Sequence, residues 1–243
     1  MQISMLEIIG MNLNDDERTC GDSVEKRGKT VAMNTNVKPY VVIVTGGIAT
    51  GKSEASKYLR ELGYTVLDSD KIVHDGYKKD TELYKYLVEI FSHDILDEKQ
   101  NIDRQELGKI VFADDEKLKQ LNNLVHKYVR NVLIDGINKC SDEIIFLDIP
   151  LFFEGKMSLE NAGLRYDETW LVYVSEETQK NRLKQRAIVE NKDVEQALSI
   201  IKKQMPIDEK KLLADKVINN EGSIEDLRVE INFLLKNSLY LKH

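Results

Sequence analysis

The chain has 243 residues, which is enough for one medium-sized domain with additional elements or for two small domains. Hydrophobic residues make up 42% of it and charged residues 32%, as is typical of a soluble globular protein, and no apolar run is long enough to cross a membrane. The formal net charge of −7 argues against a general nucleic-acid binder, whose surface would be basic. If the chain binds phosphates, it must concentrate positive charge locally.

The cysteines and histidines form no recognisable metal-binding pattern. Cys20 and Cys140 are the only cysteines, and neither lies in a spacing that suits zinc. We therefore expect no disulfide framework and no structural zinc, and a location in the reducing cytoplasm. Each of the four histidines, taken alone, is most simply an ordinary core or surface residue: His74, His93, His126 and His243.

Residues 1–39 differ in composition from the rest of the chain. They contain no Phe, Trp or Tyr, and their middle portion is polar and rich in turn-forming residues. Such a segment buries too little apolar area to offset its ordering entropy, so we predict a flexible extension. Its opening residues have neither the basic start nor the cleavage site of a secretory signal, and its acidic residues argue against a transit peptide.

Residues 40–62 read as a short apolar strand, a glycine-containing turn and a helix. Gly46, four intervening residues, Gly51, Lys52 and Ser53 match the G-x-x-x-x-G-K-[ST] pattern of phosphate-binding loops. Glycines allow positive φ and a close approach of backbone N–H groups to a phosphate, and the following helix start adds further N–H groups. Lys52 can reach the β- and γ-phosphates, and the Ser53 hydroxyl can ligate Mg²⁺.

A glycine-rich turn with a solvated lysine is the simpler alternative for this stretch. Both flanks favour the phosphate-binding interpretation. A β-branched run, Val41 to Val44, precedes the turn, and Ala55, Tyr58, Leu59 and Leu62 follow at helical spacing.

The next predicted strand, residues 64–67, leads into Asp68-Ser69-Asp70. Open α/β sheets bind ligands at the carboxyl ends of their strands, where a carboxylate acts as a general base, orders Mg²⁺ or holds a ribose hydroxyl. The alternative is that one of the two aspartates caps the helix predicted at residues 71–77. We expect at least one of them to be catalytic.

Residues 81–138 are mostly helical by their apolar spacing. The stretch is too long for a simple crossover between strands and predicts a helical insertion beside the sheet. Arg104 and Arg130 are its notable charges, and each is either a solvated surface residue or a ligand for phosphate, which guanidinium groups favour.

A third predicted strand, residues 143–148, ends in Asp148 and is stopped by Pro150. Asp148 either binds a water molecule of Mg²⁺ or accepts a hydrogen bond from the local backbone. The apolar triplet that follows, residues 151–153, forms either a hydrophobic wall for a ligand or part of the core.

The fourth strand is predicted at residues 169–174, and Ser175 caps the following helix. Residues 178–211 carry nine basic and five acidic side chains, which gives this stretch a net charge of +4 in an acidic chain. This is the local positive field that phosphates require. Arg182 and Arg186 lie one helical turn apart, so both can point toward transferring phosphates.

A fifth strand is predicted at residues 216–219, before a final helix opened by a capping box of Ser223 and Asp226. Strands and helices alternate from residue 40 onward. The pattern predicts an α/β fold: a doubly wound, mainly parallel five-stranded sheet of the P-loop NTPase type, with a helical insertion domain.

From about Val41 to Leu235 the chain resembles the dephospho-coenzyme A kinases of coenzyme A biosynthesis. Its matching segments, in the order that the family has, are TGGIATGKS, DSDKIVH, IDRQELGKIVF, LNNLVH, DIPLFFE, VYVSEETQKNRLKQR, QMP with Glu209-Lys210, and ADKVINNEGS. The first indicates only a nucleoside-triphosphate site, whereas DSDKIVH, DIPLFFE and ADKVINN together are specific.

The resemblance implies a reaction and a domain plan. Enzymes of the family use ATP and Mg²⁺ to phosphorylate the 3′-hydroxyl of the ribose of dephospho-coenzyme A, which gives coenzyme A and ADP. The implied domain is residues 40–236, with a helical acceptor-binding insertion at 70–140, a lid at 177–211 and a tail at 237–243. We expect ATP and dephospho-coenzyme A as partners, no nucleic acid or membrane, and a monomer or small homo-oligomer.

The resemblance also implies site residues. Asp70 is the expected general base on the 3′-hydroxyl, Lys52 binds phosphates, Ser53 binds the metal, and Arg182 and Arg186 act from the lid. The expected ATP-binding residues are Gly47, Ile48, Ala49, Thr50, Gly51, Lys52, Ser53 and, near the adenine, Asn219. The expected acceptor-binding residues are Asp70, His74, Arg104 and Arg130.

Four positions depart from the family pattern: Ala49 replaces a usual glycine, Glu54 a threonine, Ser69 an alanine, and Lys127 a proline. None of these changes removes a charged catalytic group. Alanine resists positive φ, so Ala49 puts the detailed geometry of the loop in question.

Other functions remain as alternatives. The nearest is another nucleoside or nucleotide kinase with the same phosphate loop. A GTPase switch is disfavoured because no N-K-x-D segment is present to bind guanine. A catalytically inactive binding protein is disfavoured because Lys52, Ser53 and Asp70 are all intact.

Overall fold

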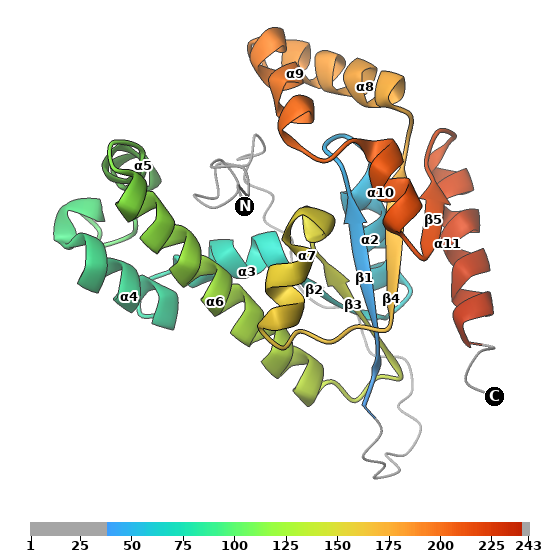
Figure 1. Cartoon of the computed structure of the whole chain (residues 1–243), viewed down its shortest axis with the longest axis horizontal. Helices are drawn as coiled ribbons and strands as arrows, with labels where there is room; N and C mark the ends of the chain where they lie inside the picture. Colours follow the sequence, from blue (N-terminus) through green and yellow to red (C-terminus); the bar gives the residue numbers. More distant parts are fainter. Residues whose placement is uncertain (1–37, 240–243) are drawn as a thin grey trace.

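A computed structural model describes residues 38–239 of the chain (Figure 1). Residues 1–37 of the predicted extension lie outside the described residues, and so do residues 240–243 of the predicted tail. None of the helices among residues 38–239 is both long enough and apolar enough to cross a membrane.

Five strands form one sheet in which all neighbouring pairs are parallel, in the order β2-β3-β1-β4-β5. This confirms the predicted five-stranded sheet. The first strand begins at Tyr40 as predicted, and the bounds of the other four strands agree with the prediction to within one residue. The strands are β1 (Tyr40–Gly46), β2 (Thr65–Asp68), β3 (Ile144–Asp148), β4 (Glu168–Tyr173) and β5 (Lys216–Asn219).

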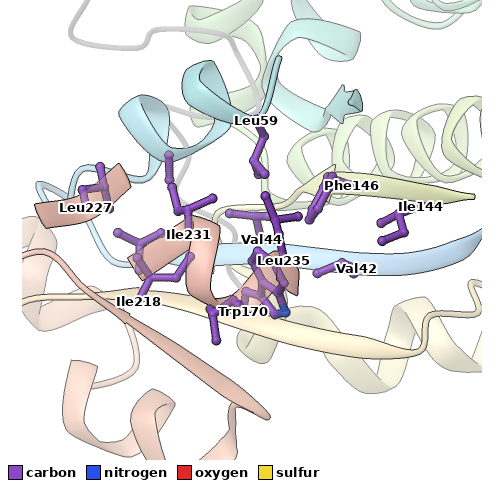
Figure 2. Packing of buried hydrophobic residues seen from close by; sticks show 13 residues of the cluster. Val42, Val44, Leu59, Ile144, Phe146, Trp170, Ile218, Leu227, Ile231 and Leu235 are labelled. Atoms are coloured by element: carbon purple, nitrogen blue, oxygen red, sulfur yellow. The ribbon is translucent and has the colours of Figure 1, made fainter. Parts of the chain in front are cut away.

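One face of the sheet is covered by α2 (Lys52–Glu61) and α11 (Ile224–Leu239). Figure 2 shows Leu59 of α2 pointing toward Val44 of β1, both in one buried cluster. Within this cluster the ring of Phe146 contacts the ring of Trp170 edge to face, with 5.4 Å between the ring centroids. The ring of Tyr64 contacts Phe146 in the same way, also at 5.4 Å.

The opposite face is covered by α6 (Asp115–Lys139), α7 (Phe152–Asn161) and α10 (Ile207–Leu213). Successive strand residues alternate between the two faces, so Val41 and Ile43 of β1 pack here while their neighbours pack under α2. Phe152 and Phe153 are buried in this second cluster. For these two residues the core alternative is therefore right.

A helical layer stands beside the sheet and has a hydrophobic cluster of its own (Figure 1). Its 25-residue helix α6 contributes Leu121 and Val125 to that cluster and Leu133 to the core of the sheet, so one helix joins the two parts. The other members of the layer are α3 (Ser69–Gly76), α4 (Glu82–Phe91), the short 3₁₀ helix η1 (His93–Ile95) and α5 (Arg104–Phe112).

Aspartate caps determine where two helices begin, and one of these starts lies earlier than predicted. Helix α3 begins at Ser69, because the Asp68 carboxylate accepts hydrogen bonds from the N–H groups of Asp70 and Lys71. Helix α5 begins at Arg104 because Asp103 caps it in the same manner. The predicted capping box of α11 is confirmed, since Ser223 and Asp226 bond each other's backbone N–H groups.

Two further helices, α8 (Glu176–Val189) and α9 (Val194–Lys203), project beyond the carboxyl end of β1 (Figure 1). Leu183, Ala187 and Ala197 form a small buried cluster between them. The chain leaves the sheet after β4, forms this helix pair, and returns through α10 to β5.

We predict that Phe146→Ala lowers the free energy of unfolding by about 3–5 kcal/mol, because it removes a fully buried ring from between two aromatic partners. Phe233→Ala on α11 is the matched control, since Phe233 is 63% exposed, and should change stability by less than about 0.5 kcal/mol. Equilibrium denaturant unfolding measures both. Equal losses for the two variants would contradict this description of the core.

Candidate active site

The predicted phosphate loop connects the central strand β1 to α2. The Thr50 hydroxyl donates to the carbonyl of Gly47 at 2.9 Å and thereby closes the turn. Gly51 has φ +88°, and a Cβ at this position would lie 2.1 Å from the amide nitrogen of Asn220. No side chain among residues 38–239 caps the start of α2, which leaves an anion-binding helix end beside the loop.

Lys52, the first residue of α2, points at the end of the neighbouring strand β3. Its ammonium forms an ion pair with the carboxylate of Asp148, which is 2% exposed. Asp148 also accepts a hydrogen bond from the Ser56 hydroxyl at 2.5 Å. Burial by itself lowers the pKa of Lys52, but the attraction of Asp148, Asp70 and Asp68 outweighs burial and raises that pKa. Lys52 is therefore a positive charge at neutral pH.

A cavity of about 340 Å³ lies over the loop. Arg182 and Arg186 line it from α8, which agrees with their predicted common direction. The guanidinium of Arg182 donates to the carbonyl of Asn220 at 2.8 Å, and Nε of Arg186 pairs with Glu190 at 3.0 Å. The loop lies across this cavity from the arginines, with Ser53 also in its wall, so backbone N–H groups and guanidinium groups converge on one space.

A second cavity lies between the sheet and the helical layer. Apolar side chains of α3, α6 and α7 form most of its wall, together with the polar side chains of Ser69, Asp70, His126, Arg130 and Ser158. It holds about 100 Å³, which is below the usual range of about 300–1,000 Å³ for ligand sites. A ligand of nucleotide size must therefore either widen it or extend out of it.

Asp70 lines both cavities. Asp68, by contrast, caps α3 and pairs with Arg60 at 3.1 Å. Asp68 is therefore the aspartate that caps the helix, and Asp70 is the one that lies between the two cavities. A carboxylate in this position can contact a hydroxyl in one cavity and face phosphates in the other.

The three basic residues expected at the acceptor lie in two places. Arg130 is in the wall of the second cavity. The guanidinium of Arg104 bonds Nδ1 of His74 at 2.7 Å and lies 5.5 Å from the centroid of the Tyr77 ring. His74 and Arg104 are not among the residues that line these two cavities.

Sequence reasoning did not single out His126. Its Nε2 is buried and has no hydrogen-bond partner within the described part of the chain, and the side chain lines the second cavity. Burial and the nearby Arg130 lower the pKa of His126, so the ring is neutral at neutral pH. The four-residue spacing of His126 and Arg130 on one helix could have indicated a shared face.

Asn220 is a second residue that the sequence did not reveal. Its buried amide donates to the carbonyl of Thr50 at 2.7 Å and so holds the phosphate loop. The predicted Asn219 instead accepts a hydrogen bond from the N–H of Glu221 at 3.1 Å, on the exposed side of the strand end.

Comparison with known proteins gives consistent matches. A family model described as dephospho-CoA kinase matches residues 40–226. A dephospho-CoA kinase of Carboxydothermus hydrogenoformans is 41% identical over 81% of this chain and 93% of its own length. One from Oceanobacillus iheyensis is 40% identical over 81% of this chain and 96% of its own length.

Two solved structures agree with these matches. A dephospho-CoA kinase from Campylobacter jejuni superposes with a TM-score of 0.61 and 29% identity, covering 84% of this chain and 98% of its own. A protein from Thermus thermophilus superposes with a TM-score of 0.66 and 31% identity, covering 83% of this chain and 98% of its own. The resemblance found in the sequence is thereby confirmed, and the chain belongs to the dephospho-CoA kinase family.

Proposed function

We propose that the chain transfers the γ-phosphoryl group of ATP to the 3′-hydroxyl of the ribose of dephospho-CoA and so produces CoA and ADP. The observation that carries this proposal is the position of Asp70 in the wall shared by the two cavities. A kinase for a hydroxyl acceptor needs one group that contacts the acceptor while facing the phosphates of the donor.

ATP binds in the cavity over the phosphate loop in this proposal. Backbone groups of the loop from Gly47 to Ser53, which includes Ile48, Ala49, Thr50 and Gly51, surround the phosphates, and Asn219 lies toward the adenine. Lys52, Arg182 and Arg186 neutralise the charge that develops on the transferred group. The raised pKa of Lys52 supports this role, because it keeps the ammonium charged.

Asp70 is the general base in this mechanism. Its carboxylate accepts the proton of the 3′-hydroxyl as the oxygen attacks the γ-phosphorus, and the bond from that phosphorus to the bridging oxygen of ADP breaks. Asp68 does not fill this role, because its oxygens accept backbone hydrogen bonds and pair with Arg60.

Magnesium fits the donor groups at the start of α2. The Ser53 hydroxyl would ligate it, and the Asp148 carboxylate suits a bond to one of its waters, since Mg²⁺ takes few protein ligands beside phosphates and water. When bound, the ion neutralises phosphate charge. Lys52 already pairs with Asp148, which keeps both groups close to the phosphate site.

The acceptor binds on the side of the helical layer. Arg130 suits a phosphate of dephospho-CoA, the neutral ring of His126 suits a hydroxyl or carbonyl, and the apolar wall suits the uncharged arm. His74 and Arg104 form a pair at the outer part of this layer and would contact the acceptor only where it extends out of the cavity.

The domain plan follows from these roles. Residues 40–236 act as one catalytic unit, residues 70–140 bind the acceptor, and residues 177–211 form the lid. The enzyme acts in the cytoplasm, where the free thiol of Cys140 stays reduced, as a monomer or small homo-oligomer without nucleic-acid or membrane partners.

The direct test is ADP release measured in a coupled assay with ATP, Mg²⁺ and a panel of acceptors. We expect rapid turnover with dephospho-CoA and at least 100-fold lower kcat/KM with adenosine or AMP, because these lack the arm that contacts the apolar wall. The second candidate, a nucleoside or nucleotide kinase, shares the same phosphate loop. Phosphorylation of adenosine or AMP without phosphorylation of dephospho-CoA would favour it over our proposal.

We predict different effects for Asp70→Asn and Lys52→Ala. Asp70→Asn should lower kcat by at least 100-fold with little change in ATP affinity, because it removes the base and keeps the shape of the side chain. Lys52→Ala should weaken ATP binding and turnover together, because it removes the buried ammonium from the loop. Steady-state kinetics and ATP titration measure the two effects separately.

Two exposed residues provide matched controls: Asp115→Asn at the start of α6 and Lys57→Ala on α2. Both should retain wild-type kinetics within about twofold. Unchanged turnover in Asp70→Asn would refute the assignment of the base.

A further inference from the structure

Two carboxamide side chains bond the tip of the phosphate loop, and one of them, Gln204, also lines the cavity over the loop. Oε1 of Gln204 accepts from the N–H of Ile48 at 2.9 Å, and Nε2 of Gln179 donates to the carbonyl of Ile48 at 2.8 Å. A backbone N–H only donates and a carbonyl only accepts, so these partners also fix the orientation of both amides. The peptide groups on either side of Ile48 are therefore each bound by one glutamine.

The two glutamines come from opposite ends of the lid. Gln179 lies near the start of α8, and Gln204 directly follows α9. Gln179 is 3% exposed, and a Cβ on Gly47 would lie 2.5 Å from its Nε2. The glycine at position 47 is thus required for the close approach of this amide to the loop.

Apolar contacts join the same two parts. The side chains of Ile48 and Ala49 pack against the small cluster of Leu183, Ala187 and Ala197 between the lid helices. Ala49 has φ +61°, a conformation that alanine resists, and its φ depends on the orientation of the peptide that Gln179 bonds. The packing and the hydrogen bond together hold this residue in a backbone region that glycine adopts more easily.

We propose that Gln179 and Gln204 are positioning residues, which hold the Ile48 peptides and so keep the phosphate loop in its ATP-binding shape while the lid is in place. This inference depends on the proposed function in one respect, which is that the loop binds ATP. Neither glutamine acts on the reacting atoms. When a bond to Ile48 is lost, the loop around Ala49 relaxes and its N–H groups no longer converge on the phosphates.

The first test is Gln204→Leu, which keeps the approximate size of the side chain and removes the acceptor. We expect ATP to bind about tenfold more weakly by calorimetric titration without acceptor, which corresponds to about 1.4 kcal/mol. The KM for dephospho-CoA should stay within about twofold. Gln196→Leu on α9 is the matched control, because Gln196 is exposed and lies on the same lid, and it should bind ATP as the wild type does.

A second pair of variants separates positioning from charge. Gln204→Glu retains an acceptor for the N–H of Ile48, whereas Gln179→Glu replaces a donor by a carboxylate facing a carbonyl. Both add one negative charge beside Ile48, and the charge at position 204 also faces the cavity over the loop, where it repels ATP and so works against the expected difference. We therefore expect Gln204→Glu to bind ATP about tenfold more tightly than Gln179→Glu.

Equal ATP affinities for the two glutamate variants would overturn the proposal. So would a Gln204→Leu protein that has a lower unfolding temperature but wild-type ATP affinity, since that result indicates only a structural role. The outcome is independent of the acceptor. A wild type that binds ATP without phosphorylating dephospho-CoA would refute the proposed function and leave this inference intact.

Discussion

Parallel pairing of β2, β3 and β1 is the constraint on which the rest of the structure depends. In this register Asp68 lies opposite Asp148, which in turn lies opposite Val44, two residues before the phosphate loop. The carboxyl ends of three strands thus bring two acids and the loop to one edge of the sheet. The acids raise the pKa of Lys52 against its burial, so a charged ammonium is stable where phosphates bind. A shift of one residue in this register would separate these groups.

Two helical units complete the site from opposite sides of that edge. The helical layer is joined to the sheet by α6, which contributes to both hydrophobic clusters, and it places Arg130 and His126 near Asp70. The pair α8 and α9 is the second unit, and α8 places Arg182 and Arg186 in the wall of the cavity over the loop. Each unit has its own small hydrophobic core.

Much of the fold could be predicted from the sequence, because strand patterns, the loop motif and aspartate caps are local signals. The site could be predicted only in part. Asp68 ends β2 and Asp70 lies two residues further on, and only the cap at α3 distinguishes their roles. The contacts of the loop with Gln179, Gln204 and Asn220 join positions 131, 156 and 170 residues apart, and no local pattern predicts such pairs. Their glutamine and asparagine side chains also occur commonly on surfaces.

The proposed reaction requires that Asp70 contact the acceptor hydroxyl between the two cavities. A crystal structure with dephospho-CoA and a non-hydrolysable ATP analogue tests it most directly. We predict a carboxylate oxygen of Asp70 within about 2.6–3.2 Å of the ribose 3′-oxygen, with that oxygen facing the γ-phosphorus. A 3′-hydroxyl that faces another side chain, with Asp70 out of hydrogen-bond reach, would contradict the account.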